Sequence, residues 1–163
     1  AAKRLVIEHP VITEDALQTL KSALHENWKA SVIDAVYDPA LGEEGLKSKL
    51  EEICMKSAQA VNDGFPVLIL SHRNVGPNAA PIPSLLVTGC LHHHLIAEKL
   101  RTETALVVEC GDAREVHDFC TLVGFGADAV CPYIAYEAIR SMNASGRLSA
   151  VNNGTTLGDD EAV

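Results

Sequence analysis

Pro66-Val67-Leu68-Ile69-Leu70-Ser71 is the stretch of sequence that decides the fold. Its central residues are all apolar, so apolar and polar positions do not alternate along it. A strand of this composition is buried on both faces, which is typical of a parallel sheet covered by helices. The run therefore predicts a buried parallel strand, and the flanking segments are expected to supply further strands and helices.

Strand and helix patterns alternate on both sides of this run. Short stretches rich in β-branched or aliphatic residues predict strands at 31–37, 104–109 and 127–131. Apolar residues at spacings of three and four predict helices after Thr13, over 43–62, from Ser84, over 112–124 and from Pro132 to Gly146. Residues 72–83, which are rich in proline and glycine, are expected to form a loop.

This alternation predicts an α/β domain in which about four parallel strands are joined by right-handed crossovers. Four strands are too few to close an eight-stranded barrel. The chain is therefore expected to form either a small layered sheet or about half of a TIM-barrel-like wheel. Half a wheel leaves sheet edges that neighbouring protein can cover.

The sequence also predicts capping residues and apolar faces for three of these helices. Thr13 is expected to cap the first helix, and the spacing of Asp112 and Glu115 predicts a capping box for the helix that ends at Gly124. The helical patterns also predict inward-facing apolar side chains at Leu85, Leu86, Cys90, Leu91 and Leu95, and a shared apolar side at Val116, Phe119, Cys120 and Val123.

Length and charge limit the class of protein. A chain of 163 residues fits one domain, which we expect over residues 1–150, followed by an acidic, flexible tail over 151–163 leading to another domain. The net charge of −9 argues against partners such as nucleic acids and anionic membranes, which attract basic proteins. No apolar run predicts a membrane span, and the first residues show no signal peptide.

The cysteines indicate a reducing environment. No two of them form a C-x-x-C motif, and the five positions are Cys54, Cys90, Cys110, Cys120 and Cys131. Most of them fall in predicted helices or strands, where cysteine behaves as a small apolar residue. We therefore expect reduced core thiols and an intracellular reducing compartment, either cytoplasm or plastid.

Polar side chains follow the predicted parallel strands at their carboxyl ends, where α/β sheets bind ligands. These ends are Ser71-His72-Arg73, Glu109-Cys110-Gly111 and Cys131-Pro132-Tyr133. A Cys–His nucleophile pair built from Cys110 or Cys131 with His72 lacks a visible orienting group. Ion pairs of Arg73, Arg114 or Arg140 with Glu109, Glu115 or Glu137 are a commoner use of such residues than substrate binding.

Other motifs do not form a site. Three adjacent histidines, His92-His93-His94, point about 100° apart on a helix and cannot converge on one metal ion, even if His117 joins one of them. Gly124-Phe125-Gly126 precedes a strand, whereas a dinucleotide fingerprint follows one. From the residues alone, no catalytic, cofactor-binding or metal-binding residue is assigned.

Three stretches resemble a known family. They are 80–86 with 91–95, then 106–109 with 113–117, and Gly124-Phe125-Gly126-Ala127-Asp128-Ala129-Val130-Cys131-Pro132-Tyr133-Ile134-Ala135. Their order and distances, together with the opening 8–13, resemble the central domain of glutamate synthase, large-subunit type. The 129–133 string is more similar to the eukaryotic NAD(P)H-dependent branch than to the ferredoxin-dependent one. Two places depart from the family, which usually has an aspartate at His72 and small apolar residues where this chain has Thr88-Gly89-Cys90.

The resemblance implies a part in an enzyme that makes glutamate from glutamine and 2-oxoglutarate. In that enzyme an amidotransferase domain releases ammonia, and another domain uses FMN, an iron–sulfur cluster and NAD(P)H or ferredoxin. The central domain is barrel-like, binds no cofactor of its own and joins these partners within one polypeptide. It would position both catalytic domains and help shield ammonia, so that the isolated fragment would be inactive.

Residues at the strand ends and in the adjoining loops are the candidates for interdomain contact under this hypothesis. They are Ser71, His72, Arg73, Pro81, Pro83, Ser84, Glu109, Arg114, His117, Pro132 and Tyr133. The alternatives are a free-standing barrel-like enzyme that uses His72, Glu109 and Cys131, or an interaction module. A reactive thiol at Cys131 would favour the enzyme, and a large exposed apolar patch would favour either the module or the fragment.

Overall fold

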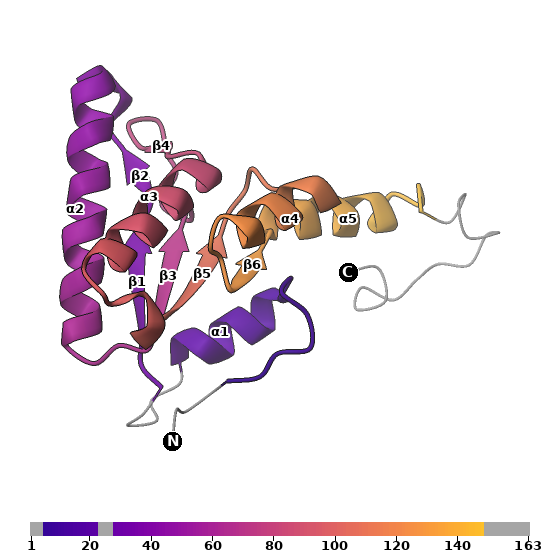
Figure 1. The fold of residues 1–163 in the computed structure, drawn as a ribbon. Helices are drawn as coiled ribbons and strands as arrows, with labels where there is room; N and C mark the ends of the chain where they lie inside the picture. The colour runs from indigo at the N-terminus through magenta and orange to yellow at the C-terminus, as the bar shows by residue number, and fades with distance from the viewer. Residues whose placement is uncertain (1–4, 23–27, 149–163) are drawn as a thin grey trace.

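A computed structural model describes residues 5–22 and 28–148, and the predicted tail 151–163 lies outside these residues. The main sheet has four parallel strands in the order β1 (Ala30–Asp34), β3 (Val67–Ser71), β5 (Ala105–Glu109) and β6 (Ala129–Cys131). The four strands lie side by side in their order along the chain (Figure 1), which is also the neighbour order of a barrel. The predicted α/β class with a parallel sheet is confirmed.

Helices flank the sheet on both sides (Figure 1). They are α1 (Glu14–Ser22), α2 (Gly42–Asn62), α3 (Ser84–Ala97), α4 (Val116–Gly124) and α5 (Tyr133–Ala144), with single 3-10 turns at Pro39–Leu41 and Arg101–Glu103. Thr13 caps α1 as predicted, because its Oγ1 accepts a hydrogen bond of 3.2 Å from the backbone N–H of Ala16. None of the helices in the described residues is long and apolar enough to cross a membrane.

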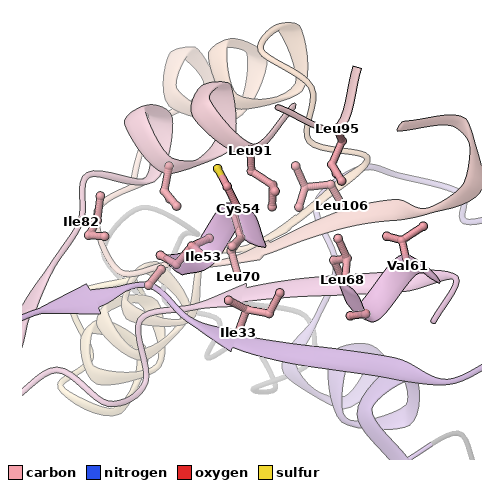
Figure 2. Packing of buried hydrophobic residues seen from close by; sticks show 13 residues of the cluster. Ile33, Ile53, Cys54, Val61, Leu68, Leu70, Ile82, Leu91, Leu95 and Leu106 are labelled. Carbon is pink, nitrogen blue, oxygen red and sulfur yellow. The ribbon is translucent and has the colours of Figure 1, made fainter. Parts of the chain in front are cut away.

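The run that predicted the fold is buried along its whole length in β3. On one face, Leu68 and Leu70 pack with Leu106 against α2 and α3 (Figure 2). On the other face, Val67 and Ile69 pack with residues of α1 and α5, chiefly Leu17 and Tyr136. The lack of alternation in the sequence therefore reflects helices on both sides of the sheet.

The strand predicted at 31–37 is wrong as a single element. β1 ends at Asp34, and Val36–Tyr37 forms a separate strand, β2. β2 pairs antiparallel with β4 (Ala80–Pro81), inside the segment predicted to be only a loop. The separation occurs at Ala35, whose N–H donates to Ser71 while its carbonyl accepts from Ile82, so the chain passes from one sheet to the other.

The expected inward face of α3 is partly wrong, and the apolar side predicted on α4 is largely exposed. Leu85 and Leu86 are 39% and 43% exposed, and the buried side chains of α3 include Val87, Leu91 and Leu95. On α4, Val116 is 75% exposed, whereas Leu122 is buried. Apolar residues lie on more than one side of each helix, so spacing alone cannot identify the side that meets the sheet.

One edge of the main sheet is covered by the N-terminal segment. The backbone N–H of Val130 in β6 donates to Pro10 at 2.7 Å, and the N–H of Ile12 donates back to Val130 at 2.9 Å. The hydroxyl of Tyr136 on α5 donates to the carbonyl of Ile12 at 3.0 Å, which fixes this segment from the other side. At the opposite edge, β1 pairs with β3, and no other described strand pairs with β1.

Candidate functional site at the strand ends

The carboxyl ends of three parallel strands meet at one end of the sheet. In the strand register Ser71 is opposite Glu109, and Glu109 is opposite Cys131. The polar residues predicted at these ends are therefore brought together by backbone pairing. Glu109 occupies the middle strand, so its side chain can receive donors from both sides.

Glu109 is the centre of a buried network of ionic hydrogen bonds. Its side chain is 0% exposed, and its Oε2 accepts from Lys21 Nζ and from Ser71 Oγ, each at 2.7 Å. Its Oε1 accepts from Arg73 Nε at 2.8 Å. Burial alone would raise the pKa of Glu109, but the hydrogen bonds from Lys21, Ser71 and Arg73 outweigh burial and hold the pKa below its usual value.

A second carboxylate, Glu14 at the start of α1, extends the network to the surface. Glu14 forms ion pairs with Arg73 and with Arg140, the latter at 2.5 Å. The Arg73 guanidinium also lies over the ring of Tyr133, 3.9 Å from its centroid, in a cation–π contact. The expected pair of Arg73 with Glu109 is confirmed, whereas Arg140 pairs with Glu14, which the sequence did not indicate.

His72 is held by contacts inside the domain. Its side chain is 3% exposed, and its Nε2 donates to the Ile82 carbonyl at 2.8 Å. Its Nδ1 lies 3.9 Å from a carboxylate oxygen of Asp112. The bond to Ile82 ties the end of β3 to the segment between β4 and α3, and the approach to Asp112 brings it near the turn after β5.

The capping box predicted from Asp112 and Glu115 is wrong. Asp112 instead accepts a hydrogen bond of 2.9 Å from the backbone N–H of Ser84, and so serves the first turn of α3. The helix α4 begins at Val116, and Asp118 accepts from the backbone N–H of Glu115 at 3.0 Å. A carboxylate at a given spacing fits either helix start, and the chain turn after β5 directs Asp112 toward α3.

The remaining candidates for interdomain contact differ in exposure. The buried ones are Ser71, His72, Ser84, Glu109 and Pro132, whereas Tyr133 is half-buried and the exposed ones are Arg73, Pro81, Pro83, Arg114 and His117. A surface cavity of about 230 Å³ lies between the start of α3 and α4 and is lined in part by Pro83, Ser84 and His117. Only the exposed residues of this set are open to direct contact with another domain, whereas the buried ones pack inside this domain.

The thiols near the strand ends are poor nucleophiles. Burial raises the pKa of Cys131 to about 12, with a further contribution from the charge of Glu109. Burial likewise raises the pKa of Cys110 to about 12. Because the thiolate is the reactive form, these values argue against a cysteine enzyme built on Cys131.

Alkylation of the folded chain is expected to distinguish the cysteines. With iodoacetamide at neutral pH, the exposed Cys120 should be modified first, and Cys110 and Cys131 should stay unmodified until urea unfolds the chain. Peptide mass spectrometry of timed samples measures each rate. Modification of Cys131 as fast as that of Cys120 in the folded chain would contradict this and support the rival enzyme hypothesis.

The three adjacent histidines do not act together. Arg101 Nε donates to His92 Nδ1 at 3.0 Å, and His93 contacts His92 edge to face. Burial and the charge of Arg101 lower the pKa of His92, which keeps its ring neutral at physiological pH. In the described part of the chain no group of three or more His, Cys, Asp or Glu side chains could hold a metal ion, so these residues do not fit an iron–sulfur cluster.

Acidification is expected to remove the stabilisation that Glu109 and Glu14 provide. Both folded pKa values lie below the ordinary 4.5, because the cationic donors outweigh burial. The folded chain therefore binds fewer protons than the unfolded chain, and stability is complete above about pH 4.5 and lost as pH falls through the folded values. Urea midpoints between about pH 7 and about pH 3 measure this loss. Glu109→Gln should flatten the profile, and identical profiles for the variant and the natural chain would contradict the assignment.

The geometry defines a parallel α/β domain whose strand ends are occupied by its own ion pairs. The family model described as the glutamate synthase central domain matches residues 1–160. The chain therefore belongs to the glutamate synthase central domain family. The resemblance seen in the sequence is confirmed.

Individual relatives agree with this assignment. Glutamate synthase [NADH] of Schizosaccharomyces pombe is 42% identical over 86% of this chain, and that of Saccharomyces cerevisiae is 39% identical over 92%. The ferredoxin-dependent glutamate synthase of Pyropia yezoensis is 34% identical over 93%. Identity is thus higher with these NADH-dependent enzymes. The chain spans only 7% of the length of each yeast protein and 10% of the Pyropia protein.

Proposed function

We propose that this chain is a positioning domain within a glutamate synthase, an enzyme that makes glutamate from glutamine and 2-oxoglutarate. Its partners would be the amidotransferase and FMN domains of the same polypeptide, in an intracellular reducing compartment. The chain would hold these domains at a fixed separation and help shield the ammonia that passes between them. Fixed separation matters because ammonia lost to water would uncouple the two reactions.

The observation that carries this proposal is the filled strand-end face. In many parallel α/β enzymes this end of the sheet is the substrate site. Here the Glu109 carboxylate accepts hydrogen bonds from Lys21, Ser71 and Arg73, and the Tyr133 ring lies under the Arg73 guanidinium. The chain's own side chains therefore fill the region at the strand ends. Strand ends filled in this way are more typical of a rigid supporting domain than of a catalytic site.

An apolar row on α4 supports contact with neighbouring protein. Val116, Cys120 and Val123 lie four and three residues apart, on one face of the helix, and all three are exposed. Exposed apolar side chains that lie together on one face mark protein interaction sites. The exposed Arg114 and His117 adjoin this row at the start of α4.

The first test is the activity of the isolated chain. It should form no glutamate from glutamine and 2-oxoglutarate with NADH or reduced ferredoxin as the reductant. Chromatographic measurement of glutamate checks this result. Turnover by this chain alone would overturn the proposal.

The second test measures coupling in the full-length glutamate synthase that carries this domain. Arg114→Glu reverses an exposed charge beside the α4 row and should raise the ratio of ammonia released to glutamate formed several-fold. The matched control is Lys29→Glu, which makes the same change of charge before β1, at the opposite end of the sheet. Equal coupling in Arg114→Glu, the control and the natural enzyme would contradict a role of this face in positioning.

A further inference from the structure

Two cysteine thiols on neighbouring helices lie close together. Cys54 on α2 and Cys90 on α3 are 36 positions apart in sequence, and their sulfur atoms are 3.8 Å apart. Figure 2 shows the Cys54 sulfur directed toward α3, above the buried side chains that cover the sheet. Both cysteines are free thiols, and one donates a weak hydrogen bond to the other. The separation is short enough for a change of side-chain rotamer to bring the two sulfurs into bonding range.

The pair is reachable from one side. A surface cavity of about 390 Å³ is lined by Leu50, Glu51, Cys54, Met55, Cys90 and His94. Cys54 is 6% exposed, whereas Cys90 is only half-buried. A reagent that enters this cavity therefore meets Cys90 before Cys54.

Cys54 and Cys90 do not form a metal-binding site with the other described residues. Structural zinc needs about four protein ligands and catalytic zinc about three. In the described residues the two thiols are not joined by a third His, Cys, Asp or Glu close enough to complete such a set. Two thiols in contact, one accessible and one buried, are instead the arrangement that exchanges with a disulfide.

We propose that Cys54 and Cys90 form a reversible dithiol–disulfide modification site that is closed by exchange with a small-molecule disulfide. The Cys90 thiolate attacks one sulfur of glutathione disulfide, forms a mixed disulfide and releases one glutathione thiolate. The Cys54 sulfur then attacks the Cys90 sulfur, forms the intramolecular bond and releases the second glutathione. Two electrons pass from the protein thiols to the small disulfide, and the two thiol protons end on the two glutathione molecules.

The two steps should differ in rate. Burial, followed by the nearness of Cys90, raises the pKa of Cys54 to about 12, so its thiolate forms rarely. The mixed disulfide on Cys90 is therefore expected to accumulate first and then decay into the Cys54–Cys90 bond. The closed bond joins α2 to α3 across the face of the sheet that both helices cover.

The test uses the 163-residue chain in glutathione buffers of increasing oxidised fraction, quenched with N-ethylmaleimide and digested with trypsin. Mass spectrometry should find peptide 50–56 joined to peptide 74–99, and dithiothreitol should separate them. Samples taken early should carry glutathione on Cys90. Far-ultraviolet circular dichroism of the oxidised chain should retain the native signal, which shows that the bond forms in the folded state.

Matched variants identify the residues. Cys54→Ser should leave glutathione on Cys90 with no decay into a linked peptide, and Cys120→Ser, which removes an exposed thiol on α4, should leave the Cys54–Cys90 link unchanged. Recovery of Cys54 and Cys90 as separate N-ethylmaleimide adducts at the most oxidising ratio would overturn the proposal. So would a link that forms only after the chain is unfolded in urea.

Discussion

Glu109→Ala is expected to lower the free energy of unfolding by about 3 kcal/mol, near the lower end of the cost of breaking a buried ion pair. The change removes the acceptor shared by Lys21, Ser71 and Arg73. Lys21 is then left mostly buried with an uncompensated charge, while Arg73 can turn toward solvent and toward Glu14. Urea denaturation followed by circular dichroism measures the loss.

A double-variant cycle tests the physical reason. Lys21→Met alone leaves the buried Glu109 without its closest cation, whereas Lys21→Met with Glu109→Leu leaves no buried charge in this pair. The double variant should therefore lose less free energy of unfolding than the sum of the losses for Lys21→Met alone and Glu109→Leu alone. Glu137→Gln, which alters an exposed carboxylate on α5, is the matched control and should stay within about 0.5 kcal/mol of the natural chain. A Glu109 variant as stable as that control would refute the network.

Gly126→Ala is expected to cost about 2–5 kcal/mol, the sum of backbone strain and a steric overlap. Gly126 has a φ of +114°, and a Cβ there would lie 2.1 Å from His92 Nδ1. His92 cannot move freely, because its Nδ1 accepts the hydrogen bond from Arg101. Arg101 also donates to the Gly126 carbonyl and pairs with Asp128, so displacement of His92 disturbs the turn before β6.

Gly64→Ala separates the two causes. Gly64 has a φ of +84°, but a Cβ added there would meet no atom within 4 Å, so alanine adds strain of about 1–2 kcal/mol without overlap. The excess cost at Gly126 measures the contact with His92, and His92→Ala combined with Gly126→Ala should recover part of it. Equal costs at the two glycines would contradict the close packing of His92. Thermal and urea unfolding of the variants provide the comparison.

Much of the fold is predictable from local pattern, and the exceptions have physical causes. The continuous apolar run of β3 predicts a strand buried on both faces, and the structure confirms it. The strands β2 and β4 have two residues each, which is too short for any periodicity to be visible. The orientation of α3 was mispredicted at Leu85 and Leu86 because apolar residues surround that helix, and packing decides which of them are covered.

The site was predictable where backbone register alone brings residues together. Ser71 ends β3, Glu109 ends the adjacent β5, and Arg73 lies two residues after Ser71, so their meeting depends mainly on the order of the strands. The contributions of Glu14 and Lys21 were missed, because they require α1 to pack on the face of the sheet from which Val107 and Glu109 project. Their spacing of two helical turns places both charges on one face of α1, and this is the signal that sequence reasoning could have used.

The hydrogen bonds between the N-terminal segment and β6 also limit how copies of the domain can associate. Strand-by-strand stacking of many copies requires two open sheet edges per copy, one to receive a neighbour and one to offer. Pro10 and Ile12 already occupy the backbone groups of Val130 on the β6 side. Among the described strands of the main sheet this leaves β1 as the open edge, so pairing of this sheet between copies is expected to favour a dimer over a growing fibre.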